Sequence, residues 1–282
     1  MLLVTTIAGV RARREELAKT GQRVALVPTM GALHEGHLTL VRRGRELADE
    51  VWASIFVNPA QFGPSEDFVS YPRDLERDRA LLEREGATLL FAPSVREIYP
   101  RPAATVIDVP ELAAGLCGPY RPGHFRGVAL VVAKLLNIVQ PHVAVFGAKD
   151  WQQAVVIRRL VEDLDMPVHI EVHPTVREED GLARSSRNAY LSPEERRTAT
   201  ALSRALEAAA TALADGEKRG AALELILATE IGRAPGARLQ YAAAVDPATL
   251  QPVATAEGPV LLALAVYVGS TRLIDNVLTE GI

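Results

Sequence analysis

The 282-residue sequence contains a single cysteine, Cys117. One thiol cannot form a disulfide within the chain, and it cannot supply the thiolate cluster of a structural zinc site. The lack of further cysteines therefore excludes a small disulfide-stabilised scaffold. It is also typical of proteins that work in a reducing compartment, so we expect a cytoplasmic location.

Long hydrophobic runs and an excess of positive charge are missing as well. The longest apolar run, Val260–Val268, is much shorter than the roughly 20 residues that a membrane-spanning helix needs. The N-terminal segment MLLVTTIAGV has no basic residue ahead of its apolar run and is therefore a poor signal peptide. A formal net charge of −4 gives no basis for expecting duplex nucleic acid. We expect neither a membrane nor a nucleic acid as a partner.

Short apolar runs alternate with amphipathic stretches through the first two-thirds of the chain. Hydrophobic residues make up 48% of the sequence, as is usual for a globular protein, and the length exceeds one typical domain. The near-continuous apolarity of the runs suits a parallel sheet covered on both faces. We predict a doubly wound α/β domain, with strands at residues 24–28, 51–57, 88–92, 142–146 and 168–172 and helices at residues 37–49, 72–85, 127–138 and 151–164.

The pattern changes near Pro174, and we place a domain boundary between residues 175 and 176. An alanine-rich helix is predicted from Pro193 to about residue 214, and another over residues 217–231. Strands are predicted over residues 239–245, 260–268 and 272–278, with turn residues between them. We therefore expect residues 1–175 to form the α/β domain and residues 176–282 to form a smaller α+β domain.

The most informative segment, residues 24–37, reads VALVPTMGALHEGH. An apolar strand runs into a turn and then into two histidines, His34 and His37, in the pattern H-x-G-H. If a helix begins near His34, both imidazoles lie on one face of its first turn. The N–H groups of that turn and the helix dipole favour an anion, so the segment predicts a cradle for nucleotide phosphates. The alternative is a pair of surface histidines in an ordinary strand–helix turn.

Two further polar clusters follow predicted strands. In VNPAQFG, Asn58 and Gln61 offer donors and acceptors for the hydroxyl or carboxylate groups of a ligand. In FGAKDWQQ, Lys149 is able to reach polyphosphate oxygens, and Asp150 either holds a phosphate-bound Mg²⁺ through water or caps a helix. Gln153 lies about one helical turn after Asp150, inside the helix predicted over residues 151–164. The alternatives are a loop that satisfies its own backbone, and a solvated lysine beside a capping aspartate.

Residues 178–188, EEDGLARSSRN, combine a glycine, two hydroxyls and two guanidinium groups. They predict a flexible anion clamp that closes over phosphates, although a hydrophilic linker between domains is the competing interpretation. Residues 121–128, RPGHFRGV, are rich in cations and precede an apolar helix. We interpret that segment as a structured surface loop; the alternative is that it flanks the site.

Taken together, PTMGALHEGH, FVNPAQF, RPGHFRGV, GAKDWQQ and REEDGLARSSRN resemble the motifs of the pantoate–β-alanine ligases, in the same order and over the whole length. The H-x-G-H pattern is shared with a wider group of adenylate-forming and nucleotidyl-transferring enzymes, whereas the combination with NPAQF and DGLARSSRN is narrow. The resemblance implies a Rossmann-like N-terminal domain, a small C-terminal lid domain and a homodimer.

The resemblance also implies the reaction and the residues that serve it. ATP, with Mg²⁺ carried on its phosphates, would convert pantoate to an acyl-adenylate and release pyrophosphate; β-alanine would then displace AMP. No metal held by protein side chains is expected. His34, His37 and Lys149 would be catalytic, with His37 as proton donor, while Ser185, Ser186 and Arg187 would hold the leaving pyrophosphate. Asn58, Gln61 and Gln153 would bind substrate. The full set expected to bind ATP is Met30, Gly31, Ala32, Leu33, His34, Glu35, Gly36, His37, Gly147, Ala148, Lys149, Asp150, Val176, Arg184, Ser185, Ser186 and Arg187.

This sequence departs from the commonest family pattern at two positions. Ala148 stands where an acidic residue is frequent, and Arg184 stands where an apolar residue is frequent. These departures bear on local packing and loop electrostatics. Three other functions compete with this one. A simple nucleotidyltransferase would share H-x-G-H and the serine–arginine loop but has no reason to carry Asn58, Gln61 and Gln153. A tRNA synthetase fragment would need a tRNA-binding surface, which the acidic charge balance does not support, and a non-catalytic nucleotide sensor would bind ATP without consuming it.

Overall fold

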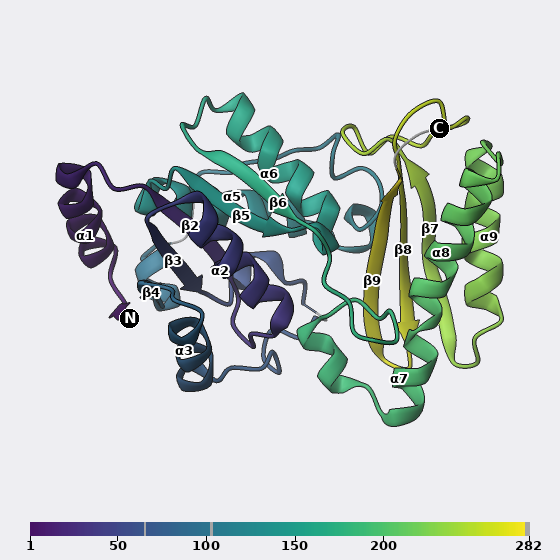
Figure 1. Cartoon of the computed structure of the whole chain (residues 1–282), viewed down its shortest axis with the longest axis horizontal. Helices are drawn as coiled ribbons and strands as arrows, with labels where there is room; N and C mark the ends of the chain where they lie inside the picture. Colours follow the sequence, from purple (N-terminus) through teal and green to yellow (C-terminus); the bar gives the residue numbers. More distant parts are fainter. Residues whose placement is uncertain (65, 102–103, 280–282) are drawn as a thin grey trace. The chain divides into compact units, whose positions relative to one another are not determined.

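A computed structural model describes residues 1–64, 66–101 and 104–279 (Figure 1). The chain divides into two compact units. The first contains residues 1–110, 121–148 and 156–174, and the second contains residues 111–120, 149–155 and 175–282. Each unit is built around its own sheet, so each is described by itself. No helix among the described residues is long and apolar enough to cross a membrane.

The first unit contains a six-stranded sheet in which the strands follow the order β1-β4-β3-β2-β5-β6. Every pairing in it is parallel. Its strands are β1 (Leu2–Val4), β2 (Val24–Thr29), β3 (Glu50–Ile55), β4 (Leu89–Phe91), β5 (Val143–Gly147) and β6 (His169–His173). Its helices are α1 (Ile7–Thr20), α2 (Glu35–Leu47), α3 (Leu75–Arg84), α4 (Val95–Ile98), α5 (His124–Val139) and most of α6 (Trp151–Asp163), together with the short turn η1 (Pro59–Gln61).

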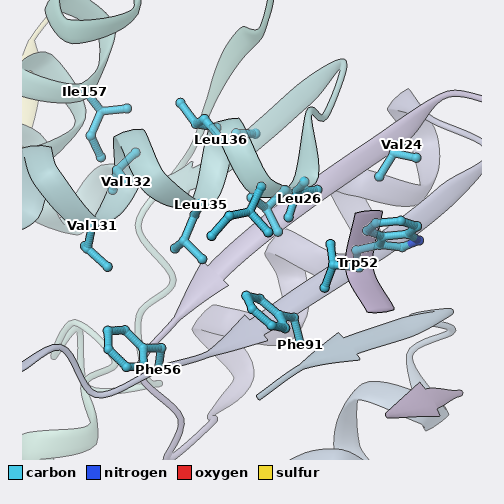
Figure 2. Close-up of a cluster of buried hydrophobic side chains, with 14 of the residues drawn as sticks. Val24, Leu26, Trp52, Phe56, Phe91, Val131, Val132, Leu135, Leu136 and Ile157 are labelled. Atoms are coloured by element: carbon cyan, nitrogen blue, oxygen red, sulfur yellow. The ribbon is translucent and has the colours of Figure 1, made fainter. Parts of the chain in front are cut away.

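Alternate residues of the strands are buried on opposite faces of this sheet. Leu26 of β2 belongs to a core with Leu135 of α5 and Ile157 of α6 (Figure 2). Its neighbour Val27 belongs to a separate core with Val41 of α2. Because apolar side chains cover both faces, the strands read as continuous apolar runs. The predicted doubly wound α/β fold is confirmed.

The order of the strands reverses between β2 and β5. From β2 the chain moves through α2 to β3 on one side, and from β5 it moves through α6 to β6 on the other side. β2 and β5 pair in parallel through Ala25 with Val143 and Leu26 with Ala144, so their carboxyl ends lie at the same edge. In open α/β sheets, ligands bind at such a switch point. Residues 30–37 follow β2 at this edge.

The second unit contains an antiparallel sheet of β7 (Ala237–Val245), β8 (Val260–Val268) and β9 (Thr271–Thr279). The helices α8 (Ala201–Ala214) and α9 (Gly220–Gly232) pack against it (Figure 1). The unit also contains α7 (Pro193–Ala199) and the short turns η2 (Gly118–Tyr120) and η4 (Ser186–Tyr190). The turn η3 (Ala148–Asp150) begins in the first unit and ends in the second. Cys117 is buried here, with its sulfur 3.3 Å from the hydroxyl of Tyr241 and 3.3 Å from a guanidinium nitrogen of Arg272.

Two features differ from the expectations drawn from the sequence. The single helix expected from Pro193 to about residue 214 is interrupted at Thr200, giving α7 and α8. The Thr200 hydroxyl donates to the Arg197 carbonyl at 2.8 Å and accepts from Arg204 at 2.6 Å, so local side-chain hydrogen bonds compete with the helix ladder. The strand β1 and helix α1 were not predicted at all. Only Val10 and Leu17 of α1 are fully buried, and such a sparse apolar face gives little periodic signal.

We predict that Leu26→Ala lowers the free energy of unfolding by about 2–5 kcal/mol, because truncating this side chain, which is 0% exposed, leaves a cavity in the core. Urea denaturation followed by circular dichroism measures this loss. Leu164→Ala is the matched control in the same unit, since that side chain is 52% exposed and its loss should change stability by less than about 0.5 kcal/mol. Equal losses in the two variants would contradict the assignment of Leu26 to the core.

Candidate active site

The H-x-G-H segment forms the start of α2. The helix begins at Glu35 with His34 at its N-cap. The His34 backbone N–H donates to His37 Nδ1 at 3.3 Å, and the two ring centroids are 4.1 Å apart. The expectation that both imidazoles share the first turn is therefore confirmed. Because Nδ1 of His37 accepts this hydrogen bond, a neutral His37 carries its hydrogen on Nε2.

The turn between β2 and α2 passes through left-handed backbone. Gly31 has a φ of 83° and Ala32 a φ of 51°. The N–H groups of Ala32 and Leu33 point to the carboxylate of Asp78 on α3, at 2.7 and 2.8 Å. Asp78 is only 1% exposed. A Cβ on Gly31 would lie 3.0 Å from this carboxylate, so the close approach favours glycine at that position.

Asp78 is a residue that the sequence analysis missed. By sequence it is one of many charges on a solvent-facing helix, yet burial raises the pKa of Asp78 despite the hydrogen bonds from Leu33 and Ala32. Its position three residues after Leu75 and four before Leu82 places it on the apolar side of α3. A charged residue at that spacing was the signal available in the sequence. Asp78 fixes the turn that leads to His34.

Side-chain hydrogen bonds hold the NPAQ turn after β3. Asn58 is 1% exposed, and its Nδ2 donates to Gln61 Oε1 and to the Gly127 carbonyl, both at 3.1 Å. Its Oδ1 accepts from the Ala60 N–H at 3.2 Å and from the Tyr99 hydroxyl at 3.0 Å. Burial raises the pKa of Tyr99 to about 12, which keeps this hydroxyl a donor. Two donors and two acceptors match the amide's usual capacity.

Gln61 connects this turn to the segment after β2. Its Nε2 donates to the sulfur of Met30 at 3.2 Å, and the residue is 9% exposed. The structure thus brings together Met30, Asn58 and Gln61, which come from two separate motifs. They lie in the first unit with Gly31, Ala32, Leu33, His34, Glu35, Gly36, His37, Gly147 and Ala148.

The remaining candidate residues belong to the second unit. Lys149 lies in η3, and its carbonyl accepts from the side chain of Asn276 on β9 at 2.8 Å. Asp150 is exposed and Gln153 is half-buried. By contrast, Gln152 is buried and its amide bonds to backbone atoms of residues 112, 115 and 117. Gln152 is therefore used to hold its own unit together.

The segment expected to act as a clamp begins with a short hairpin. The Arg184 N–H donates to the Val176 carbonyl at 2.9 Å, which closes the hairpin across its base. Arg177 makes a bidentate ion pair with the buried Asp275 of β9, at 2.6 and 3.0 Å, and also donates to the Gly181 carbonyl. The hairpin is therefore attached to the sheet of its own unit through one buried carboxylate.

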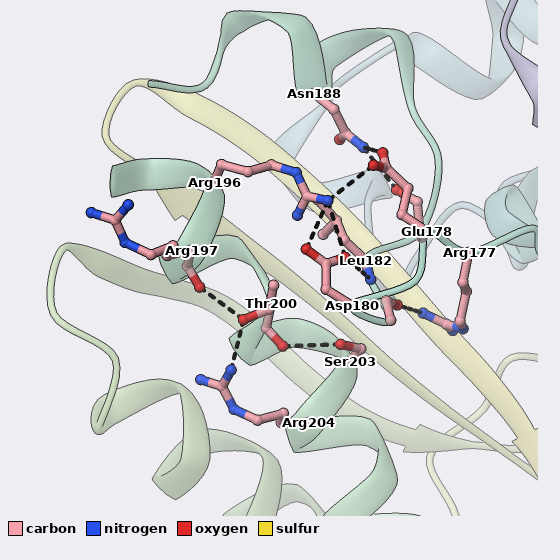
Figure 3. A network of polar contacts seen from close by, with 12 residues as sticks. Arg177, Glu178, Asp180, Leu182, Asn188, Arg196, Arg197, Thr200, Ser203 and Arg204 are labelled. Carbon is pink, nitrogen blue, oxygen red and sulfur yellow. Dashed lines mark hydrogen bonds and ion pairs between the residues drawn. The ribbon is translucent and has the colours of Figure 1, made fainter. Parts of the chain in front are cut away.

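A second group of polar contacts ties the same segment to α7 (Figure 3). Arg196 donates to Glu178 and to Asp180, each at 3.0 Å. The Asn188 amide donates to Glu178 at 3.3 Å and to the Ala183 carbonyl at 3.1 Å. The hydrogen bond from Arg196 holds the pKa of Asp180 below its usual value. These contacts connect residues 178–188 to one another and to α7 within the second unit.

The residues between these contacts include those expected to hold phosphates. Ser185 Oγ accepts from the Arg187 N–H at 3.3 Å and caps η4, which contains Ser186 and Arg187. The Nε atom of Arg184 is buried and has no hydrogen-bond partner among the residues that the structure describes. Val176, Arg184, Ser185, Ser186 and Arg187 thus lie on one hairpin and the turn that follows it.

A sequence profile of the pantoate–β-alanine ligases matches residues 2–278. The chain belongs to the pantoate–β-alanine ligase family. It is similar to the pantothenate synthetase of Heliobacterium modesticaldum, with 54% identity covering 99% of this chain and 100% of that protein. It is also similar to that of Roseiflexus sp., with 55% identity covering 100% of both.

Solved structures of the ligase family share the fold. The pantothenate synthetase of Thermus thermophilus superposes with a TM-score of 0.93 at 49% identity, covering 98% of this chain and 99% of that one. The pantoate–β-alanine ligase of Francisella tularensis, solved in complex with β-γ ATP and β-alanine, gives a TM-score of 0.80 at 34% identity, covering 99% and 97%. The family resemblance drawn from the motifs is confirmed, and the chain is an enzyme of this ligase class.

In this member of the ligase family, we predict that Asp78→Asn destabilises the fold by about 1–3 kcal/mol. The NH₂ group of asparagine cannot accept a hydrogen bond, so one of the two backbone N–H groups loses its acceptor. The folded-state pKa of Asp78 is raised, so its protonation favours the folded state. The wild type therefore gains stability relative to the variant as the pH falls from that raised pKa towards 3.8.

Urea denaturation at several pH values measures the difference between Asp78→Asn and the wild type, which should grow on acidification. Glu76→Gln is the control, since Glu76 lies exposed on the same helix and its replacement should cost less than about 0.5 kcal/mol at every pH. A difference for Asp78→Asn that shrinks on acidification would show that Asp78 is not held as described.

Proposed function

We propose that this chain condenses pantoate with β-alanine in an ATP-dependent reaction that proceeds through pantoyl adenylate. The observation that carries the proposal is the pair His34 and His37 at the first turn of α2, directly after the strand at the switch point of the sheet. The family match over residues 2–278 supports the substrates. The ligase of Francisella tularensis, solved with β-γ ATP and β-alanine, supports ATP and β-alanine as ligands.

The proposal assigns the ATP phosphates to cations and backbone donors. The first N–H groups of a helix have no partner within the helix, and the helix dipole favours negative charge there. His34 and His37 add two imidazoles at the same turn, with His37 as the proton donor. Lys149 would bridge the phosphates and the pantoate carboxylate, and Ser185, Ser186 and Arg187 would hold the leaving pyrophosphate. The remaining nucleotide contacts are assigned to backbone around Met30, Gly147 and Val176.

The proposal assigns pantoate to the amide side chains. Gln61 and Gln153 would bind its hydroxyl and carboxylate groups, with Gln61 also near β-alanine. Asn58 belongs to the same substrate-binding set, and its hydrogen bond to Gln61 Oε1 supports a role in fixing that amide. Amide side chains suit this task because each offers both donors and acceptors without adding charge.

The chemistry has two displacement steps. The pantoate carboxylate attacks the α-phosphorus of ATP, and the bond to the bridging oxygen breaks to release pyrophosphate. The amine of β-alanine then attacks the acyl carbon, loses a proton and displaces AMP. No covalent enzyme intermediate is required. The protein contributes positioning and cations aimed at the negative charge that develops on the phosphates.

Mg²⁺, a homodimer and a cytoplasmic location are part of the same proposal. Mg²⁺ prefers oxygen ligands and usually keeps several waters, so we assign it to the ATP phosphates. The carboxylate of Asp150, exposed beside Lys149, is of the right type to contact such an ion through water. The homodimer follows from the family resemblance, and sedimentation at equilibrium tests it.

We predict that exchange of labelled pyrophosphate into ATP requires pantoate and does not require β-alanine. Adenylate formation needs only the carboxylate substrate, and its reversal returns the label to ATP. Measuring the exchange with each substrate omitted in turn tests the proposal. Exchange that proceeds equally well without pantoate would favour a simple nucleotidyltransferase, and ATP binding with no exchange at all would favour a nucleotide sensor.

Lys149→Ala is expected to slow adenylate formation by about 10²–10³-fold, because it removes a preorganised cation from the phosphate site. Single-turnover measurement of pyrophosphate release gives this rate directly, and circular dichroism checks that the variant is folded. Lys218→Ala is the matched control, since Lys218 is exposed and no role is assigned to it. Near-normal adenylation in a folded Lys149→Ala variant would show that Lys149 is only a solvated surface charge.

A further inference from the structure

The RPGHFRGV segment, interpreted from sequence as a surface loop, makes direct contact with the NPAQ turn. The ring Nδ1 of His124 lies 2.8 Å from the backbone carbonyl oxygen of Gln61. Arg121 NH1 lies 2.9 Å from the other ring nitrogen, Nε2. Arg121 NH2 also donates to the Gln61 carbonyl, at 3.4 Å. Two side chains of one segment thus meet at one backbone oxygen of a proposed substrate-binding residue.

These contacts determine the protonation state of His124. A carbonyl oxygen only accepts, so Nδ1 of His124 must carry a hydrogen and donate it to Gln61. A guanidinium only donates, so Nε2 must present its lone pair to Arg121. Only the neutral ring with its hydrogen on Nδ1 satisfies both partners. A second hydrogen on Nε2 would break the bond from Arg121 and set two cations in contact.

Arg121 is itself held by a carboxylate. Its Nε and NH2 donate to the two oxygens of Glu66 at 2.7 and 2.6 Å. Burial alone would raise the pKa of Glu66, but the hydrogen bonds and charge of Arg121 outweigh it and lower that pKa. The ion pair therefore persists at neutral pH. Bidentate pairing of this kind fixes the plane of the guanidinium group as well as its position.

Close packing joins the two segments at a second point. A Cβ built on Gly127, in the first turn of α5, would lie 2.1 Å from the Ala60 carbonyl oxygen and 2.7 Å from Gln61 Cα. The Gly127 carbonyl in turn accepts from the Asn58 side chain at 3.1 Å. The NPAQ turn therefore rests directly on the backbone of the helix that begins with His124.

We propose that His124, whose neutral ring is required by its contacts with the Gln61 carbonyl and Arg121, is a positioning residue that sets the place of Gln61 and thereby the affinity of the enzyme for pantoate. This inference rests on the proposed function, in which the Gln61 side chain binds pantoate. His124 acts through the Gln61 backbone. Because the side chain of Gln61 is already oriented by Asn58 and Met30, a shift of its backbone moves an otherwise fixed amide.

The proposal makes pantoate affinity sensitive to acid. Histidine side chains commonly titrate in the slightly acidic range. Among the residues that the structure describes, the charged groups facing His124 include Arg121 and Glu66, while Arg126 of the same helix turn is exposed and paired with Asp108 at 2.6 Å. Protonation of His124 would break the contact with Arg121, so the KM for pantoate should rise as the pH falls.

The test compares His124→Ala with His124→Asn, whose side-chain amide can still donate to the Gln61 carbonyl and does not titrate. Loss of this hydrogen bond in His124→Ala is expected to raise the KM for pantoate by about tenfold and to leave the KM for ATP within about twofold. His124→Asn should recover most of the pantoate affinity, and its KM should not rise at low pH as that of the wild type does. Arg126→Ala is the matched control and should behave as wild type.

The outcomes separate this inference from the proposed function. If the wild type shows pantoate-dependent exchange but the KM for pantoate is unchanged in His124→Ala, the positioning role is wrong and the ligase assignment stands. Equal increases in the KM for pantoate and ATP would likewise overturn it, because they indicate general structural damage. If His124→Ala fails to fold, the pH dependence of the KM for pantoate decides the question. An equal rise of this KM at low pH in the wild type and in His124→Asn would refute the role of His124.

Discussion

The N–H groups of a left-handed turn must find acceptors, and in the first unit that requirement is met by one buried carboxylate. Ala32 and Leu33 both donate to Asp78, which lies more than forty residues further along the chain. The contact joins α3 to the turn between β2 and α2 and thereby fixes where α2 begins. The position of His34 and His37 at the edge of the sheet depends on it.

In the second unit, an ion pair between Arg177 and the buried Asp275 has a similar structural role. Asp275 of β9 is 2% exposed and bonds both to Arg177 and to the Asn276 N–H, the latter at 2.8 Å. Asn276 in turn holds the carbonyl of Lys149. A buried carboxylate without its cation would be strongly unfavourable, so Arg177 and Asp275 need one another. Adjacent residues of one strand thus hold the hairpin at residues 176–184 and the turn that carries Lys149.

Local patterns in the sequence predicted the elements that lie in the middle of each core. The strands of the parallel sheet are near-continuous apolar runs, and His34 stands at the N-cap of α2 where H-x-G-H indicated a helix start. The peripheral α1 escaped prediction because its apolar residues are few. The break at Thr200 escaped because helix propensity does not show a competing side-chain hydrogen bond.

The sequence predicted which motifs belong to the candidate site, but it did not predict the hydrogen bonds that connect them. Asn58 and Gln61 stand out for their chemistry, yet nothing local shows that Asn58 bonds to Gly127 or that Tyr99 bonds to Asn58. The local sequence likewise does not show that Asp78 accepts from the turn after β2 or that His124 contacts Gln61. Each of these contacts joins residues more than forty positions apart, and such pairs become visible only when the sheet has brought its strand ends together.

The burial of Cys117 has a consequence for how opening of the second unit can be observed. Its thiol is 6% exposed and lies against Tyr241 and Arg272, and the sequence contains no other cysteine. A thiol reagent can therefore modify the chain only after residues near Cys117 separate from β7 and β9. When opening is fast and reversible, the modification rate reports the free energy of that local opening. The native sequence thus contains its own reporter of sub-global unfolding.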